Sequence, residues 1–305
     1  MNLLSRLLLT FVLLTASLGA AEPAMRVTKD VAYLAPDRAE KLDIYQPANP
    51  SPAGTLAPAL VWIHGGGWMG GTKNEARAQS IAADLVTAGY VVISVEYRLG
   101  AGAWPLNLFD CKNAVRFLRA NAAKYGVDPA RIAVAGGSAG GHLALMVGLT
   151  TGVAGLEPEA AATPYPGVSS AVRAAINMYG ITNLVSRGKA AAGGAGPETI
   201  VLSGSTQKVF GASAPSDPVL RLASPVTHLA KTSVPLLTLH GRVDTTVSYA
   251  QAEELDRVAK ERGASHELLL LEKAGHTFDL RSWNKRPLER DLRPVVLEFL
   301  AKSLW

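Results

Sequence analysis

Short apolar runs recur along this chain, and longer segments with apolar residues at helical spacing lie between most of them. The runs contain little polar alternation, which is typical of strands covered on both faces. They occupy residues 59–63, 91–95, 132–135, 174–178, 235–239 and 267–272. Two earlier segments, residues 27–33 and 41–45, alternate between apolar and polar positions and predict two N-terminal strands.

The helical pattern falls between these predicted strands. It is carried by residues 75–88, 108–125, 139–149, 249–262 and 288–303. Strands that alternate with helices favour an α/β fold, with a mostly parallel central sheet flanked by helices. In such sheets, ligand sites gather at the carboxyl ends of the strands. We therefore expect the functional residues in the loops that directly follow the apolar runs.

One interval interrupts this alternation. Residues 185–233 are rich in Gly, Ala, Ser and Pro and contain few apolar runs. Because the interval lies between two strand ends, it predicts a small cap insertion over the site, and a surface excursion without a role is the alternative. The chain shows no internal repeat and no clear linker. Residues 22–305 are therefore expected to form a single domain.

The N-terminal residues have the pattern of a targeting segment. Arg6 precedes an apolar run at 7–14, and small residues follow up to Ala21. This pattern predicts a signal peptide over residues 1–21, cleaved after Ala21. A membrane-anchoring helix is the alternative, although the apolar run is short for one. We expect a secreted or periplasmic protein without a stable membrane anchor after cleavage.

Composition and charge narrow the function classes. The chain has 305 residues, 48% hydrophobic and 18% charged, with a formal charge of +5, of which Arg6 carries one. The basic residues are spread out, which argues against nucleic-acid binding. Cys111 is the only cysteine and forms no internal disulfide; it is expected to be buried in a helix. The six His show no ligand-like spacing, so neither a metal nor another cofactor is expected.

The segment around Ser138 has the form of a nucleophile elbow. Gly136-Gly137-Ser138-Ala139-Gly140 matches G-x-S-x-G and falls between a predicted strand and a predicted helix. The tight turn that lifts the Ser side chain out of the sheet requires small neighbours. A chance match is conceivable in a chain with 29 Gly, but a match at a strand-to-helix boundary is much rarer.

A serine hydroxyl needs a base, and that base needs an orienting partner. His276 follows Gly275 in a polar loop after the last predicted strand and is the expected base. Asp244 is the expected orienting acid because it closes the His-Gly-x-x-Asp segment after the preceding strand. Asp279 and Asp217 are its rivals. The order Ser, Asp, His is that of α/β-hydrolases.

The segment His64-Gly65-Gly66-Gly67-Trp68 follows another predicted strand and has the form of an oxyanion loop. We assign Gly66 and Gly67, with Ala139, to the oxyanion hole because glycine lets the backbone approach a substrate. His64 is expected to brace this loop, and His142 to be structural. Trp68 and Trp104 are expected either to line the substrate pocket or to belong to the core.

Together these segments resemble the α/β-hydrolase serine esterases of the hormone-sensitive-lipase-like kind, and in particular bacterial carboxylesterases of the feruloyl- and acetyl-xylan-esterase type. The stretches Leu42-Asp43-Ile44-Tyr45-Gln46-Pro47 and Glu96-Tyr97-Arg98-Leu99 are also similar to that group. The resemblance covers roughly residues 25–303. It implies the triad Ser138, Asp244 and His276, and an ion pair between Arg98 and Asp110. The N-terminal cap helices of hormone-sensitive-lipase relatives are not evident here.

The expected activity is that of a secreted serine carboxylesterase that cleaves short-acyl or aromatic-acyl esters through an acyl-enzyme. Small-molecule or polysaccharide-linked esters are the substrates that the resemblance implies. An arylformamidase-like amide hydrolase and a prolyl-peptidase-like hydrolase would use the same triad, although export disfavours the first and the missing propeller the second. A non-catalytic secreted binding protein on a hydrolase scaffold is the alternative of another class, but it would be expected to have lost Ser138 or His276.

Overall fold

The computed structural model of the chain describes residues 25–49, 55–187 and 202–305. The predicted signal peptide, residues 1–21, lies outside the described residues, and so does part of the predicted cap, residues 188–201.

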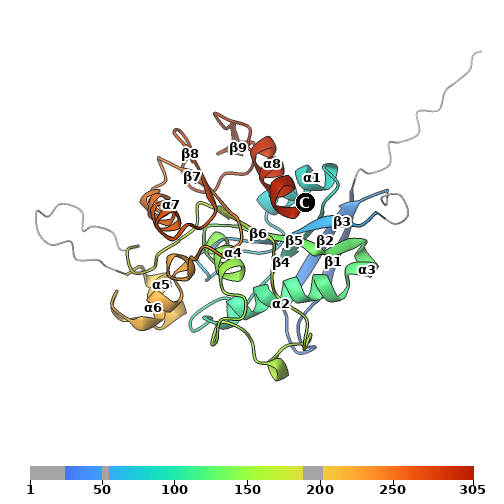
Figure 1. Cartoon of the computed structure of the whole chain (residues 1–305), viewed down its shortest axis with the longest axis horizontal. Helices are drawn as coiled ribbons and strands as arrows, with labels where there is room; N and C mark the ends of the chain where they lie inside the picture. Colours follow the sequence, from blue (N-terminus) through green and yellow to red (C-terminus); the bar gives the residue numbers. More distant parts are fainter. Residues whose placement is uncertain (1–24, 50–54, 188–201) are drawn as a thin grey trace, which may run out of the picture.

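An eight-stranded sheet forms the centre of the molecule (Figure 1). Its order is β1-β2-β4-β3-β5-β6-β7-β8. The first two strands are antiparallel to their neighbours, and the others run parallel. This arrangement confirms the predicted α/β class. The strands are β1 (Met25–Ala32), β2 (Lys41–Pro47), β3 (Ala57–Ile63), β4 (Val91–Val95), β5 (Val127–Gly137), β6 (Ala174–Met178), β7 (Leu236–Gly241) and β8 (His266–Leu271).

Helices cover both faces of this sheet, as Figure 1 shows. On one face lie α1 (Ala76–Thr87) and α8 (Arg293–Leu304); on the other lie α2 (Leu106–Ala120), α3 (Ala122–Tyr125), α4 (Ala139–Leu149) and α7 (Ala250–Arg262). The spacing of Leu108, Cys111, Val115 and Leu118 places these fully buried side chains on one side of α2. The strands β3, β4 and β6 are buried along their whole length, as their unbroken apolar runs predicted.

Two predicted helices differ from the observed ones. The segment 108–125 divides at Asn121, and α3 ends at Gly126, which adopts a left-handed conformation with φ of 64°. The segment 288–303 becomes helical only at Arg293, because Pro294 lies in the first turn. Proline lacks an N–H and is tolerated there but not in a helix interior.

The described part of the predicted cap packs against the main domain. It contains the short helices α5 (Gly204–Phe210) and α6 (Pro218–Leu222) and the 3-10 turn η2 (Pro225–His228). Val209 and Leu220 are fully buried in the core. The backbone N–H of Gly102 donates to the carbonyl of Lys208 at 2.9 Å. The described residues of the predicted cap are therefore packed into the main domain and do not form a separate layer above it.

The ion pair that the resemblance implied is not the one observed. Asp110 receives two hydrogen bonds from the guanidinium of Arg38, at 3.0 and 2.8 Å, and Arg98 contributes only its backbone N–H, at 2.9 Å. The expected pairing of the Arg98 and Asp110 side chains is therefore wrong. The loop after β1 brings Arg38 to α2, and its planar fork matches both carboxylate oxygens.

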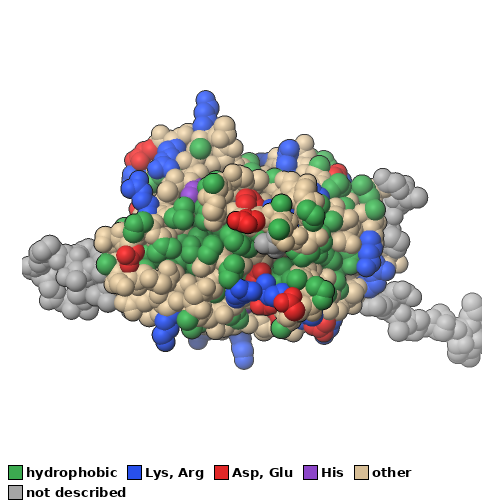
Figure 2. Space-filling model, turned by 90° about the horizontal axis from the view of Figure 1, so that it is seen from below, with side chains coloured by type: hydrophobic (Ala, Val, Ile, Leu, Met, Phe, Trp, Pro, Cys, Tyr) green, Lys and Arg blue, Asp and Glu red, His purple; other side chains and the backbone are tan. Residues whose placement is uncertain are grey.

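The face seen in Figure 2 carries apolar side chains between scattered basic and acidic ones, without a continuous basic stripe. Within the part of the chain that the structure describes, no helix has both the length and the hydrophobicity needed to cross a bilayer.

Candidate active site

Ser138 occupies a strained turn between β5 and α4. Its φ is 57° and its ψ is −121°, a conformation that non-glycine residues rarely adopt. The neighbours must be small: a Cβ on Gly136 would lie 2.3 Å from the carbonyl oxygen of Gly140, and one on Gly140 would lie 2.1 Å from that of Ile63. The first approach closes the turn on itself and the second packs it against β3, so the Ser138 side chain is held at the carboxyl end of the sheet.

The side chains of Ser138, His276 and Asp244 form a continuous chain of hydrogen bonds. Nε2 of His276 is 2.9 Å from Oγ of Ser138, and Nδ1 of His276 is 2.6 Å from Oδ2 of Asp244. Since a carboxylate only accepts, Nδ1–H donates to Asp244 and Nε2 is free to accept the serine proton. The three residues are far apart in sequence, and the structure brings them together.

The environment of Asp244 keeps its carboxyl group ionised. Burial alone would raise its pKa. The imidazoles of His240 and His276 and the backbone N–H of Val247 outweigh burial and hold the pKa of Asp244 well below its usual value. Oδ1 accepts from the N–H groups of Thr246 and Val247 at 2.8 and 2.9 Å. Nε2 of His240 lies 2.9 Å from the Val247 carbonyl and 3.4 Å from Asp244, so we assign its hydrogen bond to the carbonyl.

The two rival acids have other roles. Asp279 accepts hydrogen bonds from the backbone N–H groups of Arg281 and Ser282 and caps a turn. Asp217 accepts from the N–H groups of Ser213 and Ala214 in the same manner. Neither carboxylate bonds to His276.

The backbone N–H groups of Gly66, Gly67 and Ala139 donate no hydrogen bond to any residue that the structure describes. Gly66 and Gly67 have φ values of 116° and 61°, which favour glycine. Both line the same pocket as Ser138. Ala139 is the first residue of α4, so its N–H is one of the donors that a helix leaves unpaired. The three donors are thus available to a negatively charged oxygen.

His64 braces the glycine loop, as expected. Its ring stacks on Tyr97 with 4.4 Å between centroids, and the Tyr97 hydroxyl donates to the His64 carbonyl at 2.8 Å. Nδ1 of His64 lies 2.7 Å from the Gly65 carbonyl. The imidazole is buried, and burial lowers its pKa.

Trp68 and Trp104 do not line the pocket around Ser138. Trp68 is fully buried and packs edge-on against Phe210 and His142, at 5.1 and 5.3 Å between centroids. Trp104 also contacts Phe210, at 5.3 Å. Contact between Trp68 and a substrate is therefore ruled out in this conformation, and both tryptophans belong to the core beside the oxyanion loop.

The pocket around Ser138 has a volume of about 340 Å³ and contains residues that sequence reasoning missed. Glu75, Arg77 and Tyr179 lie on its wall, with Thr246 and Thr277. Tyr179 directly follows the apolar run at 174–178, so the strand-end rule that located His64 and Ser138 could have found it. Glu75 and Arg77 follow no strand end and carry no such signal.

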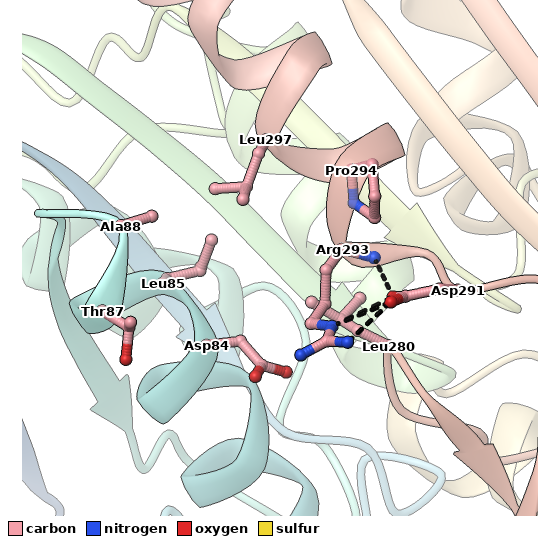
Figure 3. Close-up of a pocket in the computed structure, with 9 residues that line it drawn as sticks. All are labelled: Asp84, Leu85, Thr87, Ala88, Leu280, Asp291, Arg293, Pro294 and Leu297. Atoms are coloured by element: carbon pink, nitrogen blue, oxygen red, sulfur yellow. Dashed lines mark hydrogen bonds and ion pairs between the residues drawn. The ribbon is translucent and has the colours of Figure 1, made fainter.

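A second pocket of about 560 Å³ lies between α1 and α8 (Figure 3). Its polar lining residues are Asp84, Thr87, Asp291 and Arg293, the others are apolar, and it shares no residue with the pocket around Ser138. Its larger volume does not make it the reaction site, because it contains no nucleophile and base in contact. Across residues 25–49, 55–187 and 202–305, no three His, Cys, Asp or Glu side chains are grouped as metal ligands.

Similar proteins include esterases known from sequence and from structure. Esterase LipQ of Mycobacterium tuberculosis is 30% identical over 90% of this chain, which spans 62% of the length of LipQ. A truncated carbohydrate esterase from gut microbiota is 27% identical, with a TM-score of 0.76 over 93% of this chain and 99% of that chain. Esterase 2 of Thermogutta terrifontis, with butyrate bound, is 26% identical, with a TM-score of 0.66 over 92% of both chains.

The esterase of Thermogutta terrifontis is also known phosphoramylated by tabun. The curated relatives are longer than this chain, which spans 56% of LipM and 58% of LipC of the same mycobacterium. The profile of the BD-FAE family matches residues 42–258, well over half of the sequence. The resemblance inferred from the motifs is thereby confirmed, and the chain belongs to the BD-FAE family of α/β-hydrolase esterases.

Proposed function

We propose that this protein is an exported serine carboxylesterase that hydrolyses short-acyl or aromatic-acyl esters through an acyl-enzyme intermediate. One observation carries the proposal: Oγ of Ser138 lies 2.9 Å from Nε2 of an imidazole whose Nδ1 lies 2.6 Å from a buried carboxylate. This arrangement supplies a nucleophile, its base and the group that orients the base.

In the first half-reaction, Oγ of Ser138 attacks the ester carbonyl carbon and its proton moves to Nε2 of His276. The carbonyl oxygen gains the negative charge and faces the N–H groups of Gly66, Gly67 and Ala139. When the tetrahedral intermediate collapses, the carbon–oxygen bond to the alcohol breaks and the alcohol takes the proton from Nε2. One such N–H donor typically contributes about 3 kcal/mol to the stability of the transition state.

In the second half-reaction, water attacks the acyl-enzyme and gives a proton to Nε2. The carbon–Oγ bond then breaks, Ser138 regains its proton, and the carboxylic acid leaves. Asp244 stays ionised throughout, because its low pKa keeps it from accepting the imidazolium proton. Its charge stabilises the protonated His276 in both halves.

Different observations support the proposed acyl group and the proposed alcohol of the substrate. The described part of the predicted cap is built of short helices without a long apolar face, which favours short acyl groups. The similar esterase of Thermogutta terrifontis carries butyrate, which supports the same range. The likeness to a carbohydrate esterase supports polysaccharide-linked esters among the substrates.

A phosphonate ester probe followed by mass mapping tests the reaction. We expect one adduct on Ser138, and none in Ser138→Ala, whose turnover should fall by about a million-fold. Absence of label on Ser138 in the wild type would remove the enzyme from the serine hydrolases. A substrate panel from p-nitrophenyl acetate to octanoate, with methyl ferulate, acetylated xylan and N-formylkynurenine, then identifies the ester; cleavage of the formyl amide alone would replace the esterase by a formamidase.

Export rests on the N-terminal sequence alone, and it is tested separately. N-terminal sequencing of protein recovered outside the cytoplasm should begin at Glu22. An intact Met1 on protein that sediments with membranes would favour an anchoring helix instead.

A further inference from the structure

Among the residues that the structure describes, every side chain on the wall of the Ser138 pocket carries a polar group. They belong to Glu75, Arg77, Ser138, Tyr179, Thr246, His276 and Thr277, and the rest of the wall is glycine. Small-molecule pockets are usually lined by hydrophobic side chains with few polar groups. The side chains around this nucleophile can therefore form hydrogen bonds with a part of the substrate that itself carries polar groups.

Glu75 and Arg77 form an anchored pair within this wall. Nη2 of Arg77 donates to Oε2 of Glu75 at 2.9 Å, and Nε1 of Trp62 donates to Oε1 at 3.2 Å. The guanidinium lies over the ring of Tyr179, 6.0 Å from its centroid. The side chains of Arg77 and Glu75 keep 22% and 18% of their surface exposed, and both line the pocket.

Contacts with Tyr179 connect this pair to the imidazole of His276. The alcohol oxygen takes its proton from Nε2 of His276, so groups next to the imidazole face the alcohol rather than the acid. Tyr179 contacts His276 edge-on, with 5.0 Å between ring centroids, and the same Tyr179 ring lies beneath Arg77. One aromatic ring thus separates Arg77 from the proton donor of the leaving group.

The pair has unused hydrogen-bonding capacity of both kinds. A guanidinium has five N–H donors; Arg77 uses one of them on Glu75, and the Tyr179 hydroxyl lies close enough to engage a second. Each carboxylate oxygen of Glu75 accepts one hydrogen bond and can accept another. Neighbouring hydroxyl groups both donate and accept, so they match this pair. A carboxylate ligand would meet the charge of Glu75, and an alkyl alcohol would leave the donors unpaired.

We propose that Glu75 and Arg77 select the leaving alcohol, and that they favour a neutral alcohol with neighbouring hydroxyl groups over an alkyl alcohol of the same size. This inference rests on the proposed esterase activity. Glu75 and Arg77 lie outside the Ser138–His276–Asp244 contacts. Their role is in specificity, and they take no part in proton transfer.

Three acetates of similar ring size test the inference: a monoacetate of methyl β-xylopyranoside, cyclohexyl acetate, and the acetate of a hydroxycyclohexanecarboxylate. The wild type should prefer the xyloside to cyclohexyl acetate in kcat/KM. In Arg77→Met that preference should fall about 10- to 100-fold, because hydrogen bonds to a charged group are lost. The loss should appear mainly in KM, and Arg77→Lys should restore part of it. Glu75→Gln should shift the preference in the same direction.

Arg293→Met is the matched control, because Arg293 pairs with Asp291 at 2.7 Å in the other pocket (Figure 3). Its preference should equal that of the wild type. Equal losses on the xyloside and on cyclohexyl acetate in Arg77→Met would overturn the inference, as would a loss largest on the carboxylate substrate. Phosphonate labelling of Ser138 in each variant reports whether the site is still folded. Full labelling of Arg77→Met with no change of preference would refute this inference alone, whereas missing label in the wild-type enzyme would refute the esterase.

Discussion

The ring of Tyr179 meets the imidazole of His276 edge-on, with 5.0 Å between the centroids and an interplanar angle of 65°. Tyr179 follows β6 directly and has a φ of 44°, so the backbone is strained where its ring enters the site. Its hydroxyl donates to the Phe278 carbonyl at 3.0 Å. In addition, Nε1 of Trp283 donates to the His276 carbonyl at 3.0 Å. The loop that carries the proposed base is therefore held by two aromatic side chains.

Replacing Tyr179 by phenylalanine keeps the ring and removes the hydrogen bond to the Phe278 carbonyl. A buried carbonyl left unpaired costs about 1–3 kcal/mol in unfolding free energy. We also expect kcat to fall by about tenfold, because the loop can shift the imidazole from its position against Ser138. Denaturant unfolding and steady-state kinetics measure the two effects.

Tyr165→Phe is the control for this change. The Tyr165 hydroxyl donates to the Tyr33 carbonyl at 2.8 Å, away from the site. The Tyr165→Phe substitution should lower the unfolding free energy and leave kcat at the wild-type value. A Tyr179→Phe enzyme with full kcat would show that the ring alone positions His276.

Asp244→Asn should remove the charge that stabilises the protonated imidazole and should favour the wrong tautomer of His276. We expect kcat to fall about ten-thousandfold while KM changes little. Asp279→Asn tests the rival acid in the same loop region, and its kcat should stay at the wild-type value because Asp279 caps a turn. A larger loss in Asp279→Asn than in Asp244→Asn would reverse the assignment of the orienting acid.

Ser138, Asp244 and His276 were predictable because each one lies next to a feature that can be recognised in the sequence. Gly136 and Gly140 flank Ser138 in a turn that excludes a Cβ, and Asp244 and His276 come shortly after strands. The apolar runs in the sequence locate those strand ends, and the parallel arrangement of the strands brings them to one edge of the sheet. The fold class followed from the same alternation.

The remaining parts of the site depend on packing between distant segments. Arg77 reaches the pocket from the first turn of α1, and Trp283 lies in the short strand β9 (Ser282–Trp283), which pairs with β10 (Arg286–Pro287). No spacing rule relates either one to Ser138. The partner of Asp110 was mispredicted for the same reason, since Arg38 reaches it from a loop 72 residues earlier.

Gly140→Ala should disturb the elbow directly. The added Cβ would lie 2.1 Å from the carbonyl oxygen of Ile63, a backbone atom that has little freedom to move. We expect a loss of at least about 1–3 kcal/mol in unfolding free energy, together with weaker phosphonate labelling of Ser138. Gly204→Ala is the control, because nothing lies within 4 Å of its Cβ and α5 begins there. Comparable losses in the two variants would mean that the elbow tolerates the methyl group.

His142 should make the stability of the protein depend on pH. The imidazole is fully buried in α4, its Nε2–H donates to the Ala223 carbonyl at 2.7 Å, and its ring lies against Trp68. Burial lowers its pKa from 6.5 to about 4. Burial also lowers the pKa of His64 and of His266, and both act in the same direction.

A folded-state pKa below the unfolded value means that the unfolded chain binds more protons between pH 6.5 and 4. The stabilisation from a neutral His142 is thus complete above the unfolded pKa and is lost as the pH falls toward 4, by on the order of 3 kcal/mol. His142→Gln keeps an N–H for the Ala223 carbonyl but does not titrate, so its unfolding free energy should decrease less over this range. Urea unfolding at intervals from pH 7 to 4 measures both proteins. Parallel curves for the two would place the acid sensitivity elsewhere, with His64 and His266 as the next histidines to replace.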